Sequence, residues 1–180
     1  MKKWLIKDLE EVMGVELKRN YISFGIDIAN KITGFMVIKT DDTYLTIVTK
    51  GIIDTSKLKI RTDRYDLIAK SIRAIKIPIS EQKVAVVEMP FVGFNRAGSI
   101  VLGISAGVAY NTLKEEFPYS FFLSAVSARS RIGINKRPPK GVKIKQHVQN
   151  YIKDLMNIEE TEDIIDGCVL ALAGIVIKED

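Results

Sequence analysis

Four acidic residues stand where a carboxylate is costly unless something neutralises it. Asp27 lies within a run of β-forming residues, YISFGIDI, and Glu88 follows the apolar run VAVV. Asp163 and Asp166 are three residues apart in EDIIDGCVLALAG, so both would lie on one face of an otherwise apolar helix. A carboxylate among buried apolar neighbours destabilises a fold unless it is paired.

Together the four acids predict a site for divalent metal ions. Converging carboxylates repel one another and take up protons unless a cation keeps them ionised. Oxygen ligands without cysteine, and with one distant histidine, favour Mg²⁺ or Mn²⁺ over zinc. Taken singly, the acids have simpler explanations. Asp27 could cap a turn with Asn30, and Asp163 with Glu162 could be first-turn acids favoured by the helix dipole.

Alternating strands and helices are expected to position these acids. Strands are predicted at residues 21–28, 33–39, 44–52, 83–89 and 119–126. Helices are predicted at residues 1–19, 62–76, 96–116, 143–156 and 161–178, and a basic loop at 129–141. A hairpin meander followed by alternating helices and strands indicates an α/β fold whose mixed sheet has helices on both faces.

The composition is typical of a globular protein in a reducing compartment. Of the 180 residues, 47% are hydrophobic and 27% are charged, and this length suits one domain with a proper core. The single cysteine, Cys168, excludes an internal disulfide. Acids near the N-terminus interrupt any secretory signal, and the longest apolar stretch, 167–177, is too short to span a bilayer. We therefore expect a cytoplasmic protein with no membrane partner.

Charge is distributed unevenly along the chain, whose net charge is +5. No acid occurs between Glu116 and Asp154, and the same segment holds the basic residues Arg129, Arg131, Lys136, Arg137, Lys140, Lys143, Lys145 and Lys153. Five acids follow within residues 159–166. Such asymmetry favours a polyanion as partner of the basic segment. The alternative is a basic loop that is merely solvated.

Three motifs in the same order resemble those of the RuvC family of Holliday-junction resolvases, which belongs to the ribonuclease H-like superfamily. GIDIANKITGF resembles the first-strand signature, VVEMPF resembles the strand-four glutamate with an aromatic residue three positions later, and DIIDGCVLAL resembles the terminal D-x-x-D helix. The resemblance covers about residues 21–176. It implies a ribonuclease H-like fold with a five-stranded mixed sheet, three antiparallel strands and then parallel ones. It also implies that the metal ligands and catalytic acids are Asp27, Glu88, Asp163 and Asp166.

The resemblance extends to residues that would contact DNA. In KIKQHVQNYI it points to Lys145 as the active-site lysine, with Lys143 as the alternative, although either could be a surface lysine at a helix start. Phe91 stands where the family places an aromatic residue that stacks on unpaired bases, and it could instead be a core residue. His147 is interpreted as a surface helical residue. The remaining expected DNA contacts are Arg129, Arg131, Lys136, Arg137, Lys140 and Lys143.

These observations predict a metal-dependent endonuclease that cleaves branched DNA, chiefly four-way junctions, as a homodimer. By resemblance, two Mg²⁺ ions per active site would serve the hydrolysis, Mn²⁺ would be able to substitute, and residues 96–112 would form the dimer contact. Residues 1–20 form an additional helical extension before the nuclease domain, 21–180. The alternatives are a ribonuclease acting on RNA–DNA hybrids or structured RNA, and a non-catalytic nucleic-acid-binding scaffold. Ile28-Ala29-Asn30, where the family usually has a glycine, and the two prolines of GINKRPPKGV depart from the family pattern.

Overall fold

One six-stranded mixed sheet forms the centre of the protein. The computed structural model describes residues 2–79, 82–90, 96–134 and 137–177. The strands are β1 (Lys3–Leu5), β2 (Ile22–Asp27), β3 (Ile32–Thr40), β4 (Tyr44–Asp54), β5 (Lys83–Glu88) and β6 (Tyr119–Leu123), in the spatial order β1-β4-β3-β2-β5-β6. β2, β3 and β4 pair antiparallel, and β5 and β6 continue the sheet in parallel with β2. The five expected strands and their mixed pairing are confirmed, and β1 is a sixth strand.

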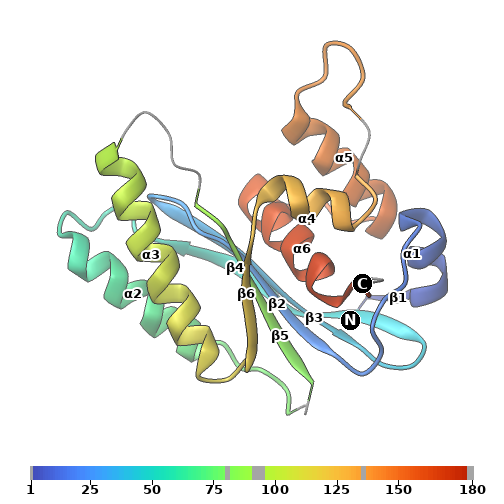
Figure 1. The fold of residues 1–180 in the computed structure, drawn as a ribbon, viewed down its shortest axis with the longest axis horizontal. Coiled ribbons are helices and arrows are strands. Elements are labelled where there is room, and N and C mark those ends of the chain that lie inside the picture. The colour runs from blue at the N-terminus through green and yellow to red at the C-terminus, as the bar shows by residue number, and fades with distance from the viewer. Residues whose placement is uncertain (1, 80–81, 91–95, 135–136, 178–180) are drawn as a thin grey trace.

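Helices cover both faces of the sheet (Figure 1). They are α1 (Ile6–Met13), α2 (Arg61–Ala74), α3 (Arg96–Lys114), α4 (Ala125–Arg131), α5 (Ile144–Met156) and α6 (Glu162–Ile175). α2 and α3 contribute to the core on one face, and α1, α4, α5 and α6 contribute to the core on the other. In the described residues, no helix is long and apolar enough to cross a membrane.

The side chains of β2 explain how closely α6 lies on the sheet. Ile22, Phe24 and Ile26 alternate toward the α2–α3 face, where they fill the core. The residues between them are small. Ser23 donates its hydroxyl to the carbonyl of Ala171, and a Cβ at Gly25 would overlap the backbone of α6. The backbone of α6 therefore rests directly on the central strands, which places its first turn next to their carboxyl ends.

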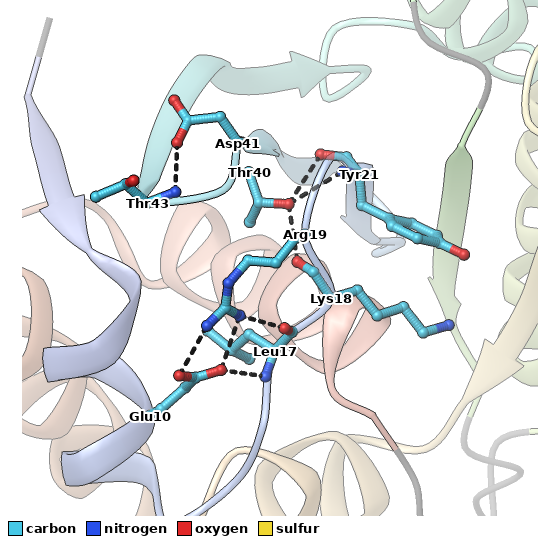
Figure 2. Close-up of polar contacts among 8 residues, drawn as sticks. All are labelled: Glu10, Leu17, Lys18, Arg19, Tyr21, Thr40, Asp41 and Thr43. Atoms are coloured by element: carbon cyan, nitrogen blue, oxygen red, sulfur yellow. Dashed lines mark hydrogen bonds and ion pairs between the residues drawn. The ribbon is translucent and has the colours of Figure 1, made fainter.

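The predicted N-terminal helix over residues 1–19 is wrong in extent. β1 occupies Lys3–Leu5 and pairs with β4, because an extended segment can form hydrogen bonds with the backbone N–H and C=O groups at the open edge of that strand. The helix that follows ends at Gly14, whose φ of 67° is readily adopted only by a residue without a Cβ. The segment that leads from α1 to β2 is held by polar contacts (Figure 2).

In those contacts Glu10 accepts hydrogen bonds from the Arg19 guanidinium and from the backbone N–H of Leu17. The bond from Arg19 lowers the pKa of the Glu10 carboxyl, whereas burial opposes the shift. Thr40 accepts from the backbone N–H of Tyr21 and donates to the carbonyl of Lys18. The chain therefore enters β2 from a fixed direction, and β2 carries Asp27 at its other end.

The predicted limits of the last strand and of the basic loop are also corrected. β6 ends at Leu123 because Ser124 caps a helix, its side chain accepting a hydrogen bond from the backbone N–H of Ser127. Residues 125–131 are therefore α4 and not the end of a strand followed by a loop. Arg129 and Arg131 therefore lie on a helix rather than in a solvated loop, and Arg131 packs over the Phe121 ring of β6.

Candidate active site

Asp27 and Glu88 lie at the ends of two neighbouring parallel strands. β2 and β5 pair in register through Ile26 and Val87, and each strand ends one residue later, at Asp27 and Glu88. Parallel strands place their carboxyl ends at the same edge of a sheet, so the two carboxylates are neighbours. The expectation from sequence that these acids lie close together agrees with the geometry of the strands.

Asp163 and Asp166 lie in the N-terminal half of α6. Gly34 is the β3 partner of Asp27, and a Cβ at Gly34 would lie 1.9 Å from the backbone oxygen of Asp163. The first turn of α6 is therefore pressed onto the sheet beside Asp27. Asp166 follows less than one turn later along the same helix. Both acids are held by backbone packing and not by a flexible loop.

A pocket of about 220 Å³ opens at this edge of the sheet. Three of the acids, Asp27, Glu88 and Asp166, line it together with two cations, Arg129 from α4 and Lys145 from α5. The remaining lining is apolar or small: Ala125, Ala128, Ile144, Val148, Val169 and Leu170. Such walls reduce contact with water, so charges within the pocket interact strongly.

Burial and repulsion act on the carboxylates of this pocket. The pKa of Asp27 is raised to about 9, first by burial, then by a hydrogen bond and charge repulsion from Glu88 and by the charge of Asp163. The pKa of Asp166 is raised to about 7, first by burial and then by the charge of Asp27. Asp163 is therefore close enough to act on Asp27, although it does not line the pocket itself.

The donor set fits a hard divalent cation. With the side chains in their present conformations, the described residues contain no group of three or more acids, histidines or cysteines close enough together to hold a metal ion. Burial and neighbouring negative charge nevertheless disfavour the ionised forms of Asp27 and Asp166, and bound positive charge would relieve both effects. Oxygen donors alone favour Mg²⁺ or Mn²⁺. Asp27, Glu88, Asp163 and Asp166 are the residues that would hold such an ion.

The two cations of the pocket have different settings. Lys145 forms an ion pair with Glu162, and this hydrogen bond is the main reason that the pKa of Lys145 is raised. The charge of Lys145 also favours the ionised forms of Asp27 and Asp166. Arg129 reaches the pocket from α4, and its charge likewise favours ionised Asp166. The sequence predicts Arg129 only as a DNA contact, because the apolar strand pattern before it hides the start of α4.

The other residues that were singled out in the sequence and that the structure describes do not line this pocket. Arg131 stacks over Phe121, with its guanidinium carbon 5.3 Å from the ring centroid. Lys143 immediately precedes α5, and Arg137, Lys140 and Lys143 are all exposed. His147 is half-buried on α5 and does not line the pocket. Phe91 and Lys136 lie outside the described residues.

A mixed sheet with acids at the ends of two central strands and on a C-terminal helix defines a protein of the ribonuclease H-like class. Within that class the chain belongs to the RuvC family, because the family described as crossover junction endodeoxyribonuclease RuvC matches residues 23–174. The family resemblance drawn from the three motifs is thus confirmed.

Individual relatives agree with this assignment. The chain is 28% identical to the crossover junction endodeoxyribonuclease RuvC of Neisseria meningitidis serogroup A over 151 residues, which cover 82% of this chain and 81% of the relative. It is 29% identical to RuvC of Francisella tularensis subsp. holarctica over 154 residues, 84% of this chain and 85% of the relative.

Two solved structures share the fold. Thermus thermophilus RuvC in complex with a Holliday junction matches with a TM-score of 0.63 at 13% identity, covering 85% of this chain and 91% of that one. The yeast mitochondrial Holliday junction resolvase Ydc2 matches with a TM-score of 0.54 at 12% identity, covering 92% of this chain and 83% of that one. The predicted ribonuclease H-like fold is confirmed.

Proposed function

We propose that this protein is a Mg²⁺-dependent endonuclease that resolves four-way DNA junctions as a homodimer. One observation carries the proposal: in a chain of the crossover junction endodeoxyribonuclease family, three acids and two cations line one pocket, and the charge of a fourth acid, Asp163, acts on Asp27. A pocket of this kind suits a phosphodiester, because it combines donors for a metal ion with cations for the phosphate.

The acids and the cations have separate roles in this proposal. Asp27, Glu88, Asp163 and Asp166 would hold two Mg²⁺ ions, which when bound supply Lewis acidity and an activated water at the phosphate. Lys145 and Arg129 offset negative charge that develops on the phosphoryl oxygens, and the apolar walls strengthen that interaction by limiting access of water. The products would carry 5′ phosphates and 3′ hydroxyls.

The substrate class is tested with the wild-type protein on labelled four-way junction, flap, duplex and RNA–DNA hybrid in Mg²⁺. We expect paired, symmetric cuts in the junction and little cutting of duplex. Preferential cutting of the hybrid would support the ribonuclease alternative, and binding without cutting of any substrate would support the scaffold alternative.

The connection between α4 and α5 is proposed to bind the phosphate backbone, because it joins two helices that line the pocket and exposes Arg137, Lys140 and Lys143. Junction affinity should fall steeply with salt as counterions are released. Replacing Arg137 and Lys140 with alanine should reduce the slope of log K against log[salt] by about one unit for each lost phosphate contact. Lys70→Ala on α2, on the other face of the sheet, is the matched control and should leave the slope unchanged. An equal slope in all variants would place the phosphate contacts elsewhere.

The homodimer is proposed to form through α3. Ile100 and Ile104 expose 63% and 46% of their surface on this helix, and a Cβ at Gly103 or Gly107 would meet no atom within 4 Å. Exposed isoleucines give this helix face apolar surface to bury, and the glycines beside them allow a second copy to approach closely. Resolving a junction also needs two symmetric sites.

Ile104→Lys is expected to convert the dimer into a monomer, because it would place a charge in the centre of this contact. Light scattering after size-exclusion chromatography measures the change. Val12→Lys is a matched control, since Val12 is 63% exposed on α1, away from α3. A dimer that persists in Ile104→Lys would move the contact to another surface.

A further inference from the structure

The ion pair between Lys145 and Glu162 joins the first turns of two helices at the pocket. Lys145 is the second residue of α5, and Glu162 is the first residue of α6. Their side chains are 66% and 42% exposed, so the pair lies at the mouth of the pocket and not on its floor. The family motifs account for Lys145 but assign nothing to Glu162.

Lys145 needs a partner to remain at this position. A lysine side chain has a flexible four-carbon stem and loses considerable conformational entropy when it is held in one place. Lys145 also lies in the first turn of α5, where the helix dipole disfavours positive charge. Glu162 lies in the first turn of α6, where the dipole favours negative charge, so it is the better placed member of the pair.

A second force acts on Lys145 from within the pocket. The charges of Asp166 and Asp27 attract its ammonium group inward, although each contributes less than the hydrogen bond from Glu162. An ammonium that moved onto these carboxylates would neutralise the groups proposed to hold the metal. Glu162 therefore opposes two displacements of Lys145, one into solvent and one onto Asp27 and Asp166.

We propose that Glu162 is a positioning residue, which holds the Lys145 ammonium at the mouth of the pocket where the scissile phosphate would meet it. The inference rests on the proposed nuclease function and adds to it a residue that acts on cleavage through Lys145, although the charge of Glu162 also contributes to the raised pKa of Asp166. Because an exposed ion pair contributes little to stability, its loss should alter catalysis far more than the melting temperature.

The test compares single-turnover cleavage of a four-way junction in Mg²⁺ with junction affinity in EDTA. Glu162→Ala should slow cleavage about tenfold through misplacement of the lysine, while affinity stays equal or rises because a negative charge near the DNA is removed. Glu162→Gln should retain an intermediate rate, because its amide oxygen still accepts a hydrogen bond from Lys145. Glu159→Ala is the matched control. It removes an exposed ion pair of the same type, to Lys153, outside the pocket, and should cleave normally.

A double-mutant cycle separates a positioning role from other roles. Glu162→Ala should cause no further loss when it is added to Lys145→Ala. An additional tenfold loss in that background, or an unchanged or faster rate in the single variant, would overturn the inference while leaving the nuclease function intact. A wild-type protein that does not cut junctions would instead overturn the proposed function, and this inference with it.

Discussion

Asp27→Asn is expected to slow junction cleavage by on the order of a thousandfold while junction binding remains intact or becomes tighter. Asp27 stands at the end of the central strand, between Glu88 on β5 and the first turn of α6, so it is the acid that the others surround. Asparagine removes a charged metal ligand and also removes repulsion toward the phosphate.

Single-turnover cleavage in Mg²⁺ and junction affinity in EDTA measure the two effects separately. Asp66→Asn on α2 is the matched control, because it removes one exposed carboxylate without touching the pocket. A cleavage rate within a fewfold of wild type would show that Asp27 does not hold the metal. Equal losses of cleavage and affinity would indicate a binding role instead.

The same variant should melt several degrees higher than wild type in metal-free buffer at neutral pH. Folding must either keep the Asp27 carboxylate charged beside Glu88 or protonate it, since burial and Glu88 raise its pKa to about 9. Asparagine avoids this cost, on the order of 1–3 kcal/mol, and retains an N–H donor toward Glu88. At about 2–4 °C per kcal/mol, scanning calorimetry would resolve the gain. A higher melting temperature would also show that the loss of cleavage in this variant is not caused by unfolding.

Gly34→Ala is expected to reduce stability and cleavage together. Its Cβ would lie 1.9 Å from the backbone oxygen and 2.2 Å from the carbonyl carbon of Asp163, and backbone atoms of a packed helix cannot yield locally. The first turn of α6 would have to move off the sheet, carrying Asp163 and Asp166 with it. We expect a loss of roughly 1–3 kcal/mol or more in unfolding free energy and a cleavage rate reduced about a hundredfold.

Gly51→Ala provides the comparison for this substitution. It adds the same methyl group to the same sheet, but the atoms it meets, at 3.2 and 3.3 Å, belong to the Phe35 ring, which can shift slightly. Its effect on the melting temperature and on cleavage should be small. If Gly34→Ala folded and cleaved like Gly51→Ala, the position of α6 would not depend on its close approach to β3.

The sequence was sufficient to identify the acids of the candidate site and the elements that carry them. An acid among β-forming residues, an acid after an apolar run and two acids three residues apart each violate the pattern of their surroundings. Such violations are visible locally, because alternation along a strand and the helical repeat are local periodicities. The ordered motifs then sufficed to predict the RuvC family, which the family match confirms.

Two features depended on contacts between distant parts of the chain: the strand β1 and the position of Arg129 in the pocket. β1 is a three-residue strand that exists because the edge of β4 is open to it, and no periodicity can appear in so short a segment. α4 begins at a serine cap that a strand pattern obscured, and only its packing brings Arg129 into the pocket.

The amino-acid sequence by itself determined which carboxylates are available, on which strands and helix they lie, and the small residues that let α6 approach the sheet. Only the tertiary structure decided which cations join them and that Glu162 pairs with Lys145, 17 positions away. The sequence was sufficient for the first set because the identity and periodicity of residues are properties of each local segment of the chain. Burial, repulsion and ion pairing depend instead on distances between segments, which folding alone creates.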